Sequence, residues 1–142
     1  MLLLPSAPAQ AQEFEHDPCA HAVTQAEINI CWAEEVAQAE DALRRTFATW
    51  LEGAPRDQVG KLREAQERWL EYREAHLRAV YPAARPYEAY GSVYPMCVAV
   101  LRLRLTLERA AEIDRFLHPI GDDLCRSSPS ARGSKDAGAA TR

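Results

Sequence analysis

What the 142-residue chain lacks already narrows its class. No apolar run approaches the ~18 residues of a membrane span, and no stretch alternates apolar and polar residues for the length of a strand. A phosphate-binding Gly-rich loop, a nucleophile elbow, a His-Glu-x-x-His run and a Cys-x-x-Cys pair are also missing. We therefore expect no transmembrane segment, no sheet and no enzyme, and we assign no catalytic residue and no cofactor.

Basic residues are too few for a nucleic-acid-binding protein. Residues 12–125 contain 13 Lys and Arg against 20 Asp and Glu, a net charge of −7, whereas residues 126–142 carry +3. An acidic body without a basic stripe excludes nucleic acid as an expected partner, because phosphates require clustered Lys and Arg. The final segment is rich in Ser, Gly and Ala and has no apolar periodicity, so residues 126–142 are expected to form a disordered tail.

The first eleven residues resemble the end of a secretory signal. They are uncharged, they begin with a short leucine run, and they end in Ala9-Gln10-Ala11, which fits a small-x-small cleavage site. The apolar run is short and no basic residue precedes it, so we interpret residues 1–11 as a signal-peptide remnant whose start lies upstream. The alternative is a disordered N-terminus. The first interpretation predicts a periplasmic or secreted protein with one domain at residues 12–125.

Apolar residues recur at helical spacing in three segments. Thr24 and Glu27 form a capping-box pattern that starts the first helix, and Gly53-Ala54-Pro55 ends it. The second segment ends at Tyr81-Pro82. In the third, Ser92 is the expected N-cap, Pro95 falls in the first turn, and the helix ends near Leu117. Three amphipathic helices with short connections predict an all-α fold, a small antiparallel bundle.

The same spacing predicts which residues each helix buries. The first helix is expected to bury Ile28, Trp32, Ala39, Leu43, Phe47, Trp50 and Leu51. The second is expected to bury Leu62, Ala65, Trp69, Tyr72, His76 and Ala79. The third is expected to bury Met96, Val100, Leu103, Leu107 and Ala110. The three tryptophans are accordingly interpreted as core residues.

Four sequence runs occur in a specific order. They are TQAEINIC at residues 24–31, AQERWLEYREA at 65–75, GSVYPM at 91–96 and LTLER at 105–109. In this order and spacing they resemble the N-terminal domain of the LprI-type lysozyme inhibitors, a family of small secreted bacterial helical domains, over roughly residues 19–114. The resemblance implies a helical, exported, non-catalytic domain whose possible partner is lysozyme. The alternative is a structural or stress-related envelope protein of the same fold that does not bind lysozyme.

The resemblance also bears on the cysteines. Cys19 and Cys31 stand where the family has its first disulfide, so we expect that bridge to tether the N-terminal segment to the first helix. The family's second pair corresponds to Leu77 and Leu101, and we interpret these residues as a bridge replaced by an apolar contact. A Cys97–Cys125 bridge is at the limit of reach, because a helix from residue 97 to 117 rises about 30 Å and the following eight residues span at most about 26 to 29 Å. The leading alternative is a free buried Cys97 and an exposed Cys125.

The loop between the second and third helices is the first candidate for partner binding. It contains Arg85, Tyr87, Tyr90 and Tyr94, and tyrosine and arginine are enriched among interface anchors. The alternative is that these tyrosines pack the loop against the end of the bundle. Arg73 is a further candidate, with the alternative that its guanidinium binds a carboxylate or carbonyl of its own bundle.

Histidines give no metal site. His16 and His21 flank Asp17, but no third ligand at a suitable spacing accompanies them. His76 falls on the expected buried face of its helix, where a hydrogen-bonded core histidine is the ordinary explanation. We therefore expect no bound metal.

Overall fold

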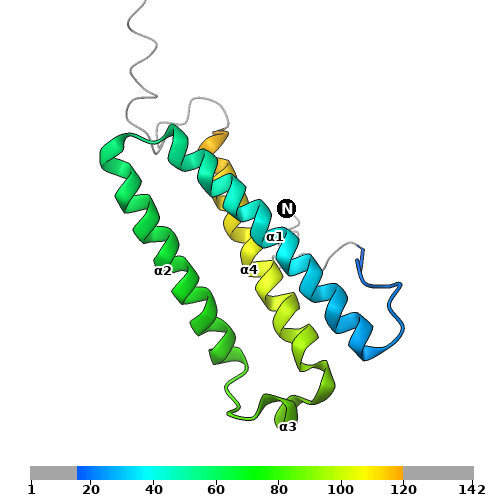
Figure 1. Cartoon of the computed structure of the whole chain (residues 1–142). Helices are drawn as coiled ribbons and strands as arrows, with labels where there is room; N and C mark the ends of the chain where they lie inside the picture. Colours follow the sequence, from blue (N-terminus) through cyan, green and yellow to red (C-terminus); the bar gives the residue numbers. More distant parts are fainter. Residues whose placement is uncertain (1–15, 120–142) are drawn as a thin grey trace, which may run out of the picture.

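The computed structural model describes residues 16–119, and within this range the secondary structure is helical. The helices are α1 (Gln25–Gly53), α2 (Arg56–Val80), α3 (Pro86–Tyr90), the 3₁₀ turn η1 (Gly91–Val93) and α4 (Tyr94–Leu117). In Figure 1, α1 and α4 run in the same direction and α2 runs in the opposite one. The expected all-α bundle of three long helices is confirmed, whereas the short α3 was not anticipated. The expected signal-peptide remnant at residues 1–11 and the expected tail at 126–142 lie outside the described residues.

The start of α1 is the predicted capping box. The Thr24 hydroxyl accepts a hydrogen bond from the Glu27 amide at 3.2 Å, and the Glu27 carboxylate accepts from the Thr24 amide at 2.9 Å. The same carboxylate accepts from the Val23 amide at 3.0 Å. These backbone donors, led by the Thr24 amide, lower the pKa of Glu27 because they stabilise its charged form. The helix ends at Gly53, as predicted, and only Ala54 and Pro55 separate it from α2.

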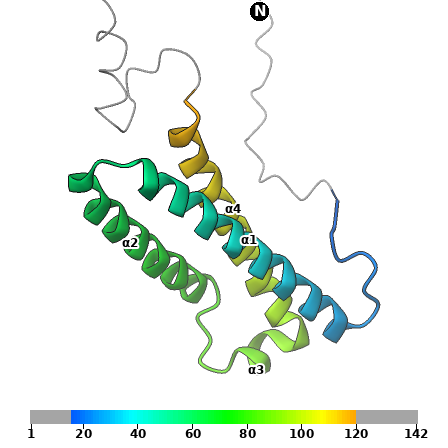
Figure 2. The ribbon, with the colours of Figure 1, turned by 45° about the horizontal axis from the view of Figure 1, so that its top comes forward.

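The main hydrophobic core lies between α1, α4 and the N-terminal segment. Figure 1 and Figure 2 both show α1 and α4 side by side, and these two helices share most of the close backbone contacts of the bundle. The buried residues of this core are Cys19, Cys31, Trp32, Val36, Ala39, Ala99 and Leu103. Ile28, Met96 and Val100 pack against them while partly exposed. The core therefore occupies the half of the bundle where α1 and α4 begin.

A disulfide joins Cys19 to Cys31, with 5.8 Å between their Cα atoms. Cys19 is 2% exposed and belongs to the core, so the bridge holds the segment before α1 against that helix. The predicted pairing is confirmed. Cys97 is free and half-buried, so it is less buried than the sequence led us to expect. Cys125 lies outside the described residues.

The face that α2 turns toward the other helices matches the predicted one only in part. Its buried residues are Leu62, Gln66, Arg73 and Leu77. Tyr72 is 55% exposed and Ala65 and Ala79 are exposed, while Trp69 and His76 are half-buried. The prediction is correct at Leu62 and wrong at Ala65, Tyr72 and Ala79, because periodicity assigned the interior to apolar residues while Gln66 and Arg73 are buried here. Leu77 is buried and Leu101 is half-buried, and their proposed pairing stays a prediction.

Arg73 lies at the centre of this polar interface. Its guanidinium donates to the Thr106 hydroxyl on α4 at 2.9 Å and forms an ion pair with Glu40 on α1 at 3.0 Å. One side chain of α2 therefore contacts both other long helices. Beside it, Glu74 binds Arg102 of α4 through two hydrogen bonds of 2.8 and 3.0 Å. Such charge-assisted bonds offset the cost of burying polar groups between helices.

The indole ring of Trp69 lies beneath two arginines of this interface. The guanidinium carbons of Arg73 and Arg109 lie 5.3 and 5.9 Å from the centre of the ring. Arg109 also donates to the side chain of Gln66 at 3.1 Å. Trp69 is therefore part of the interface between α2 and α4, although it is half-buried rather than fully enclosed.

The predictions for α4 also need correction. Val93, not Ser92, is the N-cap, and it provides no side-chain cap, because the 3₁₀ turn η1 leads directly into the helix. Pro95 lies in the first turn, as predicted. The buried residues are Ala99, Leu103, Thr106 and Ile113, and Leu107 is 43% exposed. The predicted face is correct at Leu103, and Met96 and Val100 pack against the core while partly exposed. It is wrong at Leu107, and it missed Thr106, whose hydroxyl binds Arg73 in the interior.

Candidate partner-binding site

The connection between α2 and α4 is built from short, sharply turned pieces. Pro86 begins α3, where its missing amide does no harm, and Gly91 follows α3 with a φ of 73°. That backbone conformation favours glycine, so Gly91 allows the chain to turn from α3 into η1. The result is a compact cap at one end of the bundle, seen at the bottom of Figure 1.

Four tyrosine rings meet in this cap, and we call Tyr81, Tyr87, Tyr90 and Tyr94 the tyrosine cluster. Tyr94, at the start of α4, contacts the other three, with ring centres 5.8, 5.6 and 5.7 Å from those of Tyr81, Tyr87 and Tyr90. Tyr81 and Tyr90 are 5.5 Å apart. Three of these contacts are edge-to-face and one is stacked, the arrangements that aromatic pairs prefer.

The members of the cluster differ in exposure. Tyr87 is 64% exposed, whereas the other three are half-buried. The Tyr90 hydroxyl accepts a hydrogen bond from the Ala83 amide at 3.3 Å, which ties the loop to α3. Burial raises the pKa of the Tyr81 phenol, and the nearby Cys97 thiol adds to the rise, so this hydroxyl stays neutral at physiological pH. The cluster is therefore a preorganised apolar surface with one prominent ring.

The structure brings Tyr87, Tyr90 and Tyr94 together. This arrangement agrees both with partner binding and with the alternative that the tyrosines pack the loop against the end of the bundle. Arg85 lies beside them on the surface and forms an exposed ion pair with Glu88 at 3.3 Å. Arg73 is 6% exposed, and its guanidinium binds Glu40 and Thr106 of its own bundle. This agrees with the alternative that Arg73 binds a carboxylate within the bundle, and Arg73 is not part of the cap. Sequence reasoning missed Tyr81, although its position just before Pro82 was a signal that it would lie at the loop.

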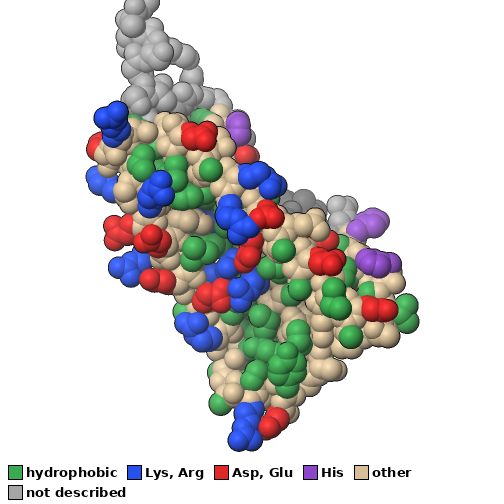
Figure 3. Space-filling view, in the orientation of Figure 1, with side chains coloured by type: hydrophobic (Ala, Val, Ile, Leu, Met, Phe, Trp, Pro, Cys, Tyr) green, Lys and Arg blue, Asp and Glu red, His purple; other side chains and the backbone are tan. Residues whose placement is uncertain are grey.

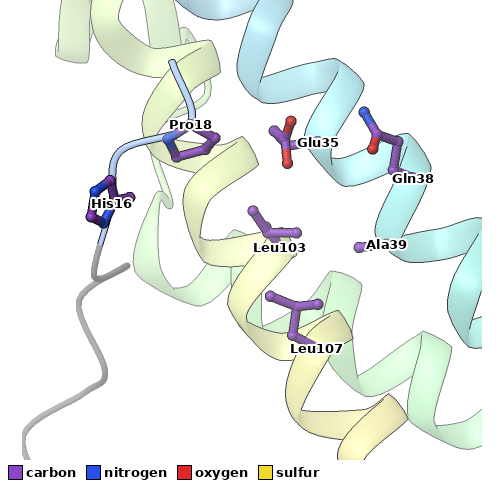
Figure 4. A pocket seen from close by; sticks show the side chains of 7 residues that line it. All are labelled: His16, Pro18, Glu35, Gln38, Ala39, Leu103 and Leu107. Carbon is purple, nitrogen blue, oxygen red and sulfur yellow. The ribbon is translucent and has the colours of Figure 1, made fainter. Parts of the chain in front are cut away.

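Two hollows lie on the described part of the chain, one next to the cap and one beside the N-terminal segment. Figure 3 shows hydrophobic side chains gathered near the lower end of its face, between the end of α2 and the start of α4. A pocket of about 320 Å³ lies between these ends, lined by Val80, Tyr81, Met96, Cys97, Val100, Leu101 and Arg104. The second hollow, of about 380 Å³, lies between the N-terminal segment, α1 and α4. Figure 4 shows Leu103 and Leu107 on the α4 side of this hollow and Glu35 and Gln38 on the α1 side.

The part of the chain that the structure describes provides little for metal chemistry or membrane insertion. Between residues 16 and 119, no group of three His, Cys, Asp or Glu side chains is placed to hold a metal ion. No helix in the same range is long and apolar enough to cross a bilayer. The surface features that remain as candidates for function are the tyrosine cluster and the two hollows.

Taken by its architecture, the molecule is a small disulfide-tethered helical bundle that presents an aromatic cluster at one end. The profile of the family described as "Lysozyme inhibitor LprI" matches residues 17–113, which is more than half of the chain, and the protein belongs to that family. The protein is also similar to "Uncharacterized protein R02472" of Rhizobium meliloti (strain 1021), with 29% identity over 130 residues that cover 82% of this chain and 90% of the relative. No solved structure is significantly similar to the chain.

Proposed function

We propose that this protein is an exported, non-catalytic binding domain that inhibits a lysozyme through the tyrosine cluster. Family membership supports a lysozyme as the partner, because the family is described as one of lysozyme inhibitors. The Cys19–Cys31 bridge supports export, because disulfides persist in oxidising compartments such as the periplasm. The proposed location is therefore periplasmic or secreted.

The observation that best supports the tyrosine cluster as the binding surface is the exposure of Tyr87, whose ring packs against the other tyrosines. Tyr87 is 64% exposed while its ring rests 5.6 Å from that of Tyr94, so the side chain is already held in place before a partner arrives. Tyrosines of this kind are frequent binding hot spots, because they bury a large area at a low cost in conformational entropy. Arg85 at the edge of the cluster adds a polar rim.

Net charge is compatible with the proposal. Residues 12–125 contain 13 Lys and Arg against 20 Asp and Glu, a net charge of −7. Figure 3 shows both signs interspersed on the face it presents. An acidic body attracts a basic lysozyme at long range and at low salt, whereas the short-range contacts of the tyrosine cluster are expected to provide most of the affinity.

The test is a titration of lysozyme activity with the purified protein. Chicken-type, goose-type and invertebrate-type lysozymes are each assayed on bacterial cell walls at low and at physiological salt, with increasing amounts of the protein. Saturable inhibition of at least one type is the expected result, with slower association at the higher salt. If no type is bound or inhibited even at low salt, the proposal is wrong and a structural role in the envelope becomes the better explanation.

A further inference from the structure

The pocket of about 320 Å³ between the end of α2 and the start of α4 has an unusual lining. Its walls are apolar side chains from both helices, Val80 on one side and Met96, Val100 and Leu101 on the other. Tyr81 joins the pocket to the tyrosine cluster, and Cys97 contributes a free thiol. Arg104, one helical turn beyond Leu101 on α4, is the single charged residue that residues 16–119 contribute to the lining.

Arg104 differs from the other arginines that lie between α2 and α4. Arg73, Arg102 and Arg109 each form an ion pair with a glutamate. Arg104 forms none with any carboxylate of residues 16–119, although Glu108 stands one turn away on the same helix. In addition, the Nε atom of Arg104 is buried without a hydrogen-bond partner. A buried donor without an acceptor is rare in folded proteins and calls for a specific explanation.

The polar groups of the lining can all donate hydrogen bonds, and the charge they carry is positive. The guanidinium of Arg104 is a donor of hydrogen bonds and carries a positive charge, and the Tyr81 hydroxyl and Cys97 thiol can donate as well. Among the described residues, no carboxylate lines the pocket. A lysine or arginine of a partner would therefore meet a like charge here, and a neutral apolar group would leave Arg104 unpaired. The ligand that would pair with Arg104 and also contact the apolar walls is an anion attached to an apolar group.

We propose that this pocket binds a small amphiphilic monocarboxylate. The carboxylate accepts hydrogen bonds from Arg104, whose planar fork suits two carboxylate oxygens, and the alkyl chain lies against Val80, Val100 and Leu101. The volume of about 320 Å³ is near the lower end of the ~300–1,000 Å³ range of small-molecule sites, which favours a medium-length chain. A single cation matches one negative charge, so a monocarboxylate fits better than a phosphate dianion.

This site is separate from the proposed contact with lysozyme. Tyr87, the exposed ring of the tyrosine cluster, does not line the pocket, and Arg104 does not belong to the cluster. The two proposals can therefore fail independently. A protein that does not inhibit lysozyme could still bind the carboxylate, and a protein that does not bind the carboxylate could still inhibit lysozyme. Tyr81 is the one residue that the two surfaces share.

The experiment is calorimetric titration of the full chain with decanoate, kept below its micellar concentration. We expect saturable binding of one decanoate per chain, and binding of 1-decanol at least tenfold weaker, because the alcohol lacks the charge that Arg104 requires. The Arg104→Gln variant is expected to lose at least tenfold in decanoate affinity. Arg78→Gln is the matched control, since it removes the same charge from an exposed position of α2 outside the pocket and should leave affinity unchanged.

A second measurement covers the case in which Arg104→Gln fails to fold. Val80 is 47% exposed, so Val80→Trp should fill the pocket without disturbing the core and should also abolish decanoate binding. In the unmodified protein, decanoate should slow alkylation of Cys97, followed by peptide mass spectrometry. The absence of saturable binding, equal affinity for decanoate and 1-decanol, or unchanged affinity in Arg104→Gln or Val80→Trp would each overturn the proposal, as would unprotected Cys97.

Discussion

Arg73 of α2 donates a hydrogen bond of 2.9 Å from its Nη1 atom to the Oγ1 atom of Thr106, which is fully buried in α4. The Thr106 hydroxyl in turn donates to the Arg102 carbonyl of its own helix at 2.7 Å. Arg73 also reaches Glu40 of α1, so this one guanidinium connects the three long helices. The bundle is therefore held together by an apolar core between α1 and α4 and by a polar interface along α2.

The first prediction tests the geometry of this interface. Arg73→Lys keeps the positive charge but loses the planar fork, so it should lower the free energy of unfolding by about 1 to 3 kcal/mol in urea denaturation. The matched control is Arg68→Lys on the same helix, whose ion pair with Glu71 is exposed and should matter by less than about 0.5 kcal/mol. Equal effects of the two substitutions would show that the contacts of Arg73 do not hold α2.

The second prediction concerns Trp69. Trp69→Ala removes a half-buried indole and its contacts with Arg73 and Arg109, and should destabilise the protein by about 2 to 4 kcal/mol. Tyr72→Ala, three residues further along α2, removes an aromatic ring that is 55% exposed and should cost less than about 1 kcal/mol. Chemical denaturation monitored by helical circular dichroism compares them. A smaller loss for Trp69→Ala than for Tyr72→Ala would mean that Tyr72, and not Trp69, contributes to the interface between α2 and α4.

The third prediction concerns the Cys19–Cys31 bridge, which closes a loop with a sequence separation of 12. Replacing both cysteines by serine should lower stability by about 3 kcal/mol, as expected for a loop of this size. Cys97→Ser, which changes a free thiol, should retain most of the stability and should still respond to reductant. A double variant as stable as the oxidised protein would mean that the N-terminal segment stays packed on α1 without the bridge.

The fourth prediction concerns pH. The backbone donors of Thr24 and Val23 lower the pKa of Glu27 in the folded state, so its contribution to stability is present above the unfolded pKa, near 4.5. That contribution is lost as the pH falls through the lower folded pKa. Glu27→Gln should therefore be less stable than the native protein at pH 7, and the difference should shrink in acid. Glu34→Gln, at an exposed position of the same helix, is the control for removing one carboxylate charge from α1.

Local signals in the sequence predicted the helix boundaries well. The capping box at Thr24 and Glu27, the Gly53-Ala54-Pro55 stop and the Tyr81-Pro82 stop each act over a few residues, and each appears in the structure where it was expected. Ser92 failed as an N-cap because its neighbourhood forms a 3₁₀ turn, in which its carbonyl accepts a hydrogen bond from Asn29 at 3.0 Å. The sequence of residues 91–95 gives no signal for the hydrogen bond between the Ser92 carbonyl and Asn29 of α1.

The buried faces of α2 and α4 were harder to predict for a different reason. Periodicity places apolar residues inside, yet Arg73 and Thr106 occupy interior positions because each satisfies the other across two helices. That compensation depends on residues 33 positions apart, so it cannot be read from either helix alone. The tyrosine cluster was partly predictable, since three of its members share one loop. The inclusion of Tyr81 and the open lining around Arg104 required the three-dimensional arrangement of α2 and α4.

The most direct test of the proposed function compares two tyrosines. Tyr87 and Tyr72 are 64% and 55% exposed, but only Tyr87 belongs to the tyrosine cluster. Binding kinetics are measured for the native protein, Tyr87→Ala and Tyr72→Ala against the lysozyme type that the titration identifies. We predict that Tyr87→Ala speeds dissociation by about tenfold or more, equivalent to about 1.4 kcal/mol, while Tyr72→Ala leaves it unchanged. Equal dissociation rates for the native protein and Tyr87→Ala would contradict binding through this end of the bundle.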